Sequence, residues 1–303
     1  MIIIEAKLKL KKHSWNHYEN GNFDYSSSHV DYSFVETSDG LNMLVSILSK
    51  EYSEVICPIF IDILDFLYLA SGKMPEIIYY KENGFEKNDF SCRFFTSKQF
   101  CFDNDLIDIT ISTLNENNLD NIKNIIKNKP FNIFSAFTSL TSKAYENIYA
   151  EHKITMLLHC FEGYIYNKNS KYKNKRFKDR VKEIVNILFE YENKYNTEIL
   201  RTFNITEDRY LTQLTNTRHQ FSHYISQQDT LVGGKEYIQN FVILHYIFRI
   251  YLLREINLMP KEKNIEEFLK SLYDWINVSN NDKFKDFKSV AYSIKNIPKR
   301  FIG

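Results

Sequence analysis

The stretch Asn216–Tyr224, NTRHQFSHY, places one arginine and two histidines within six residues. On a helix, His219 and His223 would be four residues apart and would share a face. Arg218 would lie about 100° from His219 around that helix, so the three side chains could border one cleft. Histidine exchanges protons near neutral pH, and arginine offers phosphate a planar set of charged donors. The stretch is therefore a candidate for binding a metal or for acting on a phosphate without one.

The metal interpretation takes the H-x-x-x-H spacing as two neutral zinc ligands. A third ligand would have to come from elsewhere in the chain, where His152, His159 and His245 are the candidate imidazoles. Arg218 opposes this interpretation, because a fixed positive charge repels a divalent ion. We therefore expect a site with no metal and no cofactor. A simpler alternative is that both histidines are exposed or capping groups of a bundle helix.

The phosphate interpretation uses all three residues. Cleavage of RNA by its own 2′-hydroxyl needs a base for that proton, a cation beside the crowded phosphorus and an acid for the departing 5′-oxygen. Histidine can serve as the acid or the base, and arginine stabilises charge on phosphate oxygens. The candidate catalytic residues are Arg218, His223 and His219. We expect His219 to contribute less than the other two.

Composition excludes several classes of protein. The 303 residues are 44% hydrophobic and 16% aromatic, which is enough for a buried core and argues against global disorder. The formal net charge of +1 excludes a protein that coats nucleic acid through bulk charge. The four cysteines form no C-x-x-C pair, so we expect neither a zinc knuckle nor a disulfide framework. The motifs of P-loop NTPases, dinucleotide enzymes, α/β-hydrolases and zincins are absent.

Two apolar segments bear on location. The N-terminal residues carry charges after only a few apolar side chains, which is not the pattern of a signal peptide. Residues 55–70 contain Pro58, Asp62 and Asp65, and they are too short and too charged to span a bilayer. We expect a cytoplasmic protein with no membrane contact.

The first part of the chain predicts short strands and two helices. Residues 6–12, AKLKLKK, alternate apolar and lysine side chains as a half-buried strand does. Other segments rich in aromatic and β-branched residues are expected to be strands: 30–36, 76–80 and 90–97.

The two predicted helices of this part cover residues 41–50 and 58–70. Pro58 suits the first turn of the second helix, and Gly72 would end it. Asp62 and Asp65 are interpreted as its solvated face. Strands and helices together predict an α+β domain.

Beyond residue 103 the composition changes, and after Pro130 the pattern is helical throughout. Four long helices and a shorter one after Pro260 are expected at residues 142–167, 176–195, 207–226, 235–257 and 264–276. The predicted fold class is therefore an α+β N-terminal domain, residues 1–130, followed by an all-α helical bundle, residues 131–303.

Two further features belong to this second domain. The tract Lys168–Lys182 carries eight basic residues and one acidic residue, with Tyr172 and Phe177 among them. Basic side chains with interleaved aromatics suit single-stranded RNA, although a solvated loop between helices explains the tract equally well. Glu162 could pair with Arg218 and orient it, or it could be a surface carboxylate.

The motif resembles a known family. Arg218 to His223 is similar to the R-x(4–6)-H signature of HEPN ribonucleases, in which a polar residue usually follows the arginine; here it is His219, where Asn is common. Residues 154–168, ITMLLHCFEGYIYNK, resemble the apolar-Glu-aromatic segment early in Apea-like HEPN domains. Residues 237–258 resemble the closing helix of that subgroup, and residues 56–77 resemble part of the domain that precedes it.

The resemblance implies an HEPN-like helical nuclease domain at residues 131–303 and a sensing or regulatory domain at residues 1–130. It implies a metal-independent endoribonuclease of prokaryotic antiviral defence by abortive infection, acting on RNA, including tRNA, after a phage-derived trigger. It also implies a homodimer, or a higher even-numbered homo-oligomer, in which the Arg218–His223 helices of two chains face each other. The alternatives are a non-catalytic RNA- or partner-binding module and a metal-binding helical bundle.

Overall fold

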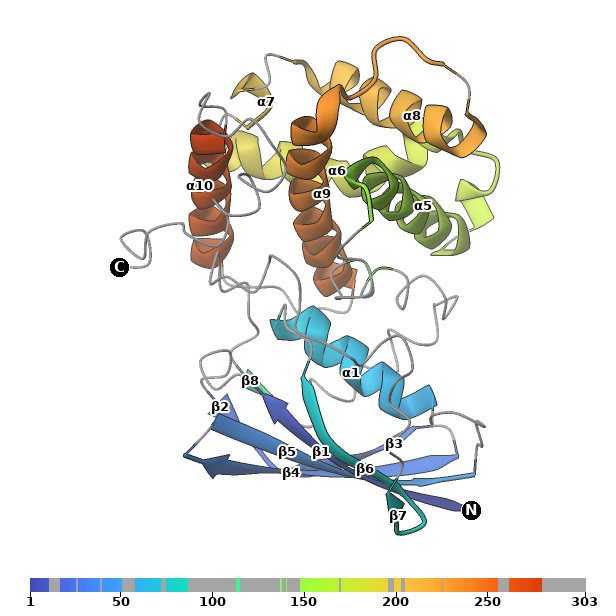
Figure 1. Ribbon diagram of the computed structural model, residues 1–303, viewed down its shortest axis with the longest axis vertical. Coiled ribbons are helices and arrows are strands. Elements are labelled where there is room, and N and C mark those ends of the chain that lie inside the picture. The colour runs from blue at the N-terminus through green and yellow to red at the C-terminus, as the bar shows by residue number, and fades with distance from the viewer. Residues whose placement is uncertain are drawn as a thin grey trace.

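The computed structural model describes most of the chain in separate segments: residues 1–10, 17–25, 27–38, 40–50, 58–71, 75–86, 113–114, 137, 140, 148–168, 170–195, 199–202, 205–224, 226–255 and 262–279. The expected strand at residues 90–97 and the domain boundary near residue 130 lie outside these segments. An antiparallel sheet region comes first, and a helical region follows (Figure 1). In the described residues, no helix is both long and apolar enough to cross a membrane.

The main sheet is antiparallel, with strand order β3-β4-β5-β1-β6-β7. Its strands are β1 (Ile2–Leu10), β3 (Gly21–Tyr25), β4 (Ser28–Thr37), β5 (Gly40–Ser49), β6 (Glu76–Glu82) and β7 (Phe85–Glu86), while β2 (His17–Tyr18) and β8 (Thr113–Leu114) form a separate parallel pair. The alternation predicted for residues 6–12 is confirmed in β1, where Ala6, Leu8 and Leu10 are buried. The strands expected at residues 30–36 and 76–80 are confirmed as parts of β4 and β6.

Residues 41–50 are not the helix that the sequence predicted. They form β5, which pairs with β4 on one side and β1 on the other. The buried side chains Leu41, Met43, Val45 and Ile47 alternate with the period of a strand. Asn42 and Leu44, on the opposite face, are also well covered, so the segment is apolar enough on both sides to imitate a buried helix. Pairing with two neighbouring strands decides the outcome.

Helix α1 (Pro58–Ser71) confirms the second predicted helix, and it lies between the sheet and the helical region (Figure 1). The ring of Phe60 contacts that of Tyr80 in β6, with centroids 5.0 Å apart. The interpretation of Asp62 and Asp65 as a solvated face is wrong, because both side chains are buried. A helix covered on one side by a sheet and on the other by helices has no solvated face.

The helical region contains α5 (Ala150–Lys168), η3 (Ser170–Tyr172), α6 (Phe177–Tyr195), α7 (Ile199–Thr202), α8 (Glu207–His223), α9 (Gly233–Glu255) and α10 (Glu262–Ser279). The helices predicted at residues 176–195, 235–257 and 264–276 are confirmed to within a few residues. The helix predicted at residues 142–167 begins at Ala150, and the helix predicted at residues 207–226 ends at His223. Helix α9 is the central one: it packs against α5 and α6, and every residue from Phe241 to Leu253 is buried.

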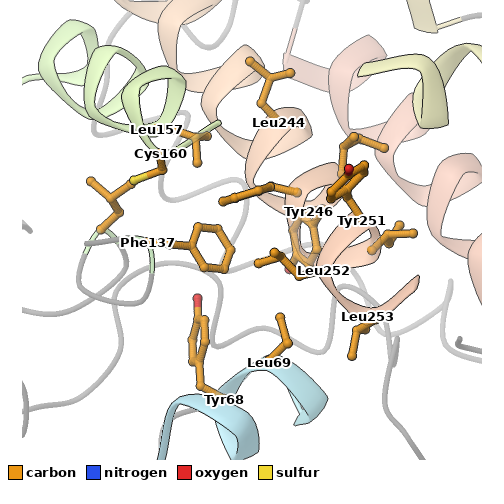
Figure 2. Packing of buried hydrophobic residues seen from close by; sticks show 14 of the residues in the cluster. Tyr68, Leu69, Phe137, Leu157, Cys160, Leu244, Tyr246, Tyr251, Leu252 and Leu253 are labelled. Atoms are coloured by element: carbon orange, nitrogen blue, oxygen red, sulfur yellow. The ribbon is translucent and has the colours of Figure 1, made fainter. Parts of the chain in front are cut away.

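A buried polar contact joins α1 to α9. We call it the α1–α9 cluster: Tyr68, Leu69, His245 and Arg249. The Tyr68 hydroxyl lies 3.2 Å from His245 Nε2, and Arg249 Nε donates to the Leu69 carbonyl at 2.6 Å. That carbonyl is in the last turn of α1, where no backbone amide of the helix is available to donate a hydrogen bond to it. Figure 2 shows Tyr68 and Leu69 reaching from α1 toward Phe137 and α9.

Candidate active site

Helix α8 carries the Arg218–His223 motif, and its sequence explains both of its ends. The Thr206 side chain accepts a hydrogen bond from the Arg209 amide, which caps the N-terminus. Tyr224 adopts a left-handed conformation, which terminates the helix directly after His223. Tyr210, Leu211, Leu214 and Thr217 are buried at helical spacing and fix the rotation of the helix. The motif residues after Thr217 are thereby left at the border of the core.

Arg218 points to a carboxylate of α5. Its Nη2 donates to Glu162 Oε2 at 2.7 Å, so of the two alternatives for Glu162 the structure shows the pairing with Arg218. The other oxygen, Oε1, accepts from Arg180 Nη1 of α6 at 2.8 Å. The guanidinium of Arg218 also lies over the ring of Phe177, 4.8 Å from its centroid. Carboxylate and ring together hold the guanidinium in one orientation.

The three charges do not cancel. One carboxylate stands between two guanidinium groups, so the Arg180–Glu162–Arg218 triad keeps a net positive charge. The Arg218 side chain is 19% exposed, and an arginine has several N–H donors beyond the one that binds Glu162. Its Nε is buried and lacks a hydrogen-bond partner among the described residues. The triad can therefore attract an anion while Glu162 fixes the position of Arg218.

His159 is the imidazole that meets the motif from α5. Its Nε2 lies 2.9 Å from the Ser222 Oγ of α8. Ser222 follows Arg218 by four residues and Glu162 follows His159 by three. The contacts 159–222 and 162–218 are therefore successive rungs between the two helices, which means that they lie one helical turn apart. We call these four residues together with His223 the α5–α8 cluster. The ring of His159 keeps an exposed edge, yet its partial desolvation and then the charge of Arg218 lower its pKa.

The two motif histidines lie side by side. The ring centroids of His219 and His223 are 4.7 Å apart, with the planes tilted by 53°. His223 is exposed, whereas His219 is half-buried. His223 is also close enough to His159 for its charge to lower the pKa of that ring. The structure thus brings together all three residues predicted from the sequence, Arg218, His219 and His223.

The other two histidines considered as metal ligands lie elsewhere. His245 is buried in the α1–α9 cluster, and His152 stands two turns before His159 on α5, where its ring faces Phe221. Among the described residues, no group of three or more His, Cys, Asp or Glu side chains could hold a metal ion.

The basic tract Lys168–Lys182 has two interpretations, a surface for single-stranded RNA and a solvated loop. The aromatic side chains that the first interpretation would use for stacking on bases are occupied: Tyr172 is buried, and Phe177 lies beneath Arg218. Three of the cations are paired, Lys168 with Glu255, Lys178 with Asp208 and Arg180 with Glu162. Lys173, Lys175 and Arg176 are exposed. Beside the site, the tract therefore offers exposed positive charge, but neither of these two aromatic rings is available for stacking on bases.

The loop between α8 and α9 is tied back onto α8. The Leu231 amide donates to the buried Thr217 Oγ1 at 2.9 Å. The Asn216 side chain donates to the Gln228 carbonyl at 2.8 Å. Both anchors directly precede Arg218, so the loop holds the helix at the point where the site begins.

Sequence reasoning did not assign a role in the phosphate site to His159 or to Arg180. For His159 a signal exists: with Glu162 it shares one face of α5, at the i, i+3 spacing. Arg180 could not be distinguished from the other cations of its tract, because only folding brings α6 against Glu162.

The helical region has recognisable relatives at the level of family. Residues 131–260, which include α5 to α9, match the family model of Apea-like HEPN domains. No curated protein and no solved structure matches the chain.

Proposed function

The helical region belongs to the Apea-like HEPN family, and from this premise we propose that the protein is a metal-independent endoribonuclease of prokaryotic antiviral defence. An HEPN domain indicates a nuclease or an RNA-related role in defence. The finer assignment rests on one observation: Arg218 is held by Glu162 at 2.7 Å beside three imidazoles, His159, His219 and His223.

The proposed reaction requires three functions. Arg218 binds the non-bridging oxygens of the scissile phosphate and stabilises the charge that grows there during attack by the 2′-hydroxyl. His223 exchanges a proton with the reacting oxygens, for which its exposed ring is suited. His219 packs against the ring of His223 and orients it. The products would be a 2′,3′-cyclic phosphate and a 5′-hydroxyl.

RNA is the proposed substrate, with tRNA among the candidates. The exposed cations Lys173, Lys175 and Arg176 supply positive charge close to Phe177 and Arg218, which draws a polyanion toward the site. We further propose that residues 1–130 sense a phage-derived trigger. The docking of α1 on α9 supports this role, because α9 also packs against α5, which contributes Glu162 and His159.

The family resemblance also motivates a homodimer with the α8 helices of two chains facing each other. Two-fold pairing is the commonest arrangement of soluble oligomers. Light scattering at decreasing concentration, combined with cleavage assays, tests it: specific activity should fall as dimer dissociates. Constant specific activity in a purely monomeric sample would contradict the dimer but not the chemistry.

A second candidate function is a non-catalytic RNA-binding module. One observation favours it: the Arg218 side chain is mostly covered and already paired with Glu162, as expected of a structural arginine. Such a protein would bind RNA and leave it intact.

One experiment separates the two candidates. Purified protein in molar excess over labelled tRNA or mRNA is incubated in EDTA, and the ends of the products are mapped. We expect cleavage that leaves 2′,3′-cyclic phosphate or 3′-phosphate ends. Binding without cleavage would support the module, and activity that requires added Zn²⁺ or Mn²⁺ would overturn the metal-independent mechanism.

A further inference from the structure

We propose that His159 is the second acid–base group of the site, so that one chain supplies both the base and the acid for RNA cleavage. This inference rests on the proposed ribonuclease function and deepens it. The Arg218–His223 motif alone contains one exposed imidazole, His223, and a half-buried one, His219. The reaction needs two proton-exchanging groups at the same phosphate, one on either side of it.

The position of His159 carries the argument. The rungs 159–222 and 162–218 lie one helical turn apart on both α5 and α8, a separation of about 5 Å along a helix axis. A phosphate bound by Arg218 would therefore lie within reach of His159. His223 follows Ser222 directly, so it borders the same space from α8. The two imidazoles come from different helices and can approach a phosphate from different directions.

The hydrogen bond to Ser222 suits His159 to act as the base. When Nε2–H donates to the Ser222 Oγ, the lone pair on Nδ1 is the one that can accept a proton. Burial, Arg218 and His223 all lower the pKa of this imidazole, whereas Glu162 raises it, and the net shift is downward. The ring is consequently neutral at neutral pH, as a base must be before it reacts.

The step balances within one chain. The 2′-hydroxyl proton moves to His159 while the 2′-oxygen forms a bond to phosphorus. The bond from phosphorus to the 5′-oxygen breaks, and the protonated His223 gives its proton to that oxygen. Arg218 stays bound to the non-bridging oxygens throughout. A homodimer would then hold two complete acid–base pairs instead of one pair shared between its chains.

Two RNA substrates distinguish the roles. One has the ordinary 5′-oxygen at the cleavage point, and in the other a bridging sulfur replaces that oxygen, because a thiolate departs without needing a proton. We expect His223→Ala to be slow on the first substrate and to recover most of its rate on the second. We expect His159→Gln to be slowed on both, by about 10²–10⁴-fold. His159 takes the proton of the 2′-hydroxyl, and this transfer is needed whether oxygen or sulfur is the leaving atom.

His152→Gln is the matched control. His152 is an exposed histidine two turns earlier on α5, and its variant should cleave both substrates at the wild-type rate. The wild-type rate should fall on the acid side with a midpoint below pH 6.5, and His159→Gln should lose that limb. Circular dichroism confirms that each variant is folded.

Each result decides between the two proposals. Rates for His159→Gln that equal those of His152→Gln on both substrates would overturn the role of His159 and leave the ribonuclease proposal intact. Recovery of His159→Gln by the bridging sulfur would overturn its assignment as the base. A wild-type protein that cleaves neither substrate, in molar excess and with EDTA present, would overturn the ribonuclease function itself.

Discussion

The α5–α8 cluster and the α1–α9 cluster each contain a histidine and an arginine, yet their surroundings differ. His159 and Arg218 come from two helices, whereas His245 and Arg249 both lie on α9. In the α1–α9 cluster, His245 and Arg249 are almost completely buried, and burial followed by the charge of Arg249 lowers the pKa of His245 to about 3. In the α5–α8 cluster, His159 and His223 are exposed.

Solvent access therefore separates a structural from a chemical use of the same side chains. A histidine held neutral in a dry core can accept one hydrogen bond, but it cannot exchange protons with a substrate. A histidine at the edge of the core can be desolvated enough to be neutral and still reach a ligand. We therefore predict that substitutions in the α5–α8 cluster alter cleavage and that substitutions in the α1–α9 cluster alter stability.

The largest effect is expected at the α5–α8 cluster. Arg218→Ala removes the cation that we propose binds the phosphate, and His223→Ala removes the proposed proton-exchanging group, so each should lower the cleavage rate by about 10²–10⁴-fold. His219→Ala should lose less, because its ring supports that of His223. The cleavage rate on labelled RNA measures activity, and urea unfolding measures the stability of each variant.

The control for these variants lies on the same helix. Arg209→Ala, an exposed arginine of α8 paired with Asp229, should keep wild-type cleavage. If Arg218→Ala and His223→Ala cleave as fast as Arg209→Ala while remaining folded, the site is misassigned and the two clusters do not differ in the way described.

The next effect is on stability. Arg249→Met removes the cation that binds the Leu69 carbonyl inside the core, and it should lower the free energy of unfolding by about 2–4 kcal/mol. Cleavage per folded molecule should be unchanged. Denaturant unfolding measures the loss. Arg254 lies five residues after Arg249 on α9, at the position where the buried run of this helix ends, and it pairs at the surface with Glu190. Arg254→Met should lose less than about 1 kcal/mol, and equal losses for the two variants would contradict the prediction.

The smallest effect that we expect is the change in the free energy of unfolding per pH unit. His245 binds a proton at its ordinary pKa of 6.5 when unfolded but only near pH 3 when folded. The unfolded state therefore holds more protons between these values, and this histidine lowers stability as the pH falls from about 6.5 to about 3, by up to about 1.4 kcal/mol per unit. Unfolding of the wild type and of His245→Gln at several pH values measures the slope. A variant with the same slope as the wild type would show that other groups set the acid sensitivity.

The predictable parts of the fold are those in which local sequence and packing agree. β1 has a clean alternation with one buried face, and α8 has a capping threonine and helical spacing of its buried residues, so both were found. The segment Gly40–Ser49 could not be assigned correctly from its own residues, because it is apolar on both faces like a buried helix. Its pairing with β4 and β1 decides the outcome, and the segment's own pattern does not encode that pairing. Asp62 and Asp65 were misjudged for a related reason: charge alone gave no indication that α1 is enclosed on two sides.

The candidate site follows the same division. Arg218, His219 and His223 lie within six residues on one helix, so spacing alone is enough to single them out. Glu162 was recognisable as a possible partner. The proposed role of His159 depends on the 2.9 Å contact with Ser222, 63 residues later in the chain, and no local pattern encodes that proximity.

The hydrogen bond from the Leu231 amide to Thr217 Oγ1 couples a backbone amide of the loop to the helix that carries the site. Amide hydrogens exchange with solvent only when their hydrogen bond opens. The Leu231 amide is bonded to the fully buried Thr217 side chain of α8, so it can exchange only when the loop lifts or the helix moves. Its exchange rate therefore records, in a single backbone signal, how often the end of α8 leaves its place on the bundle.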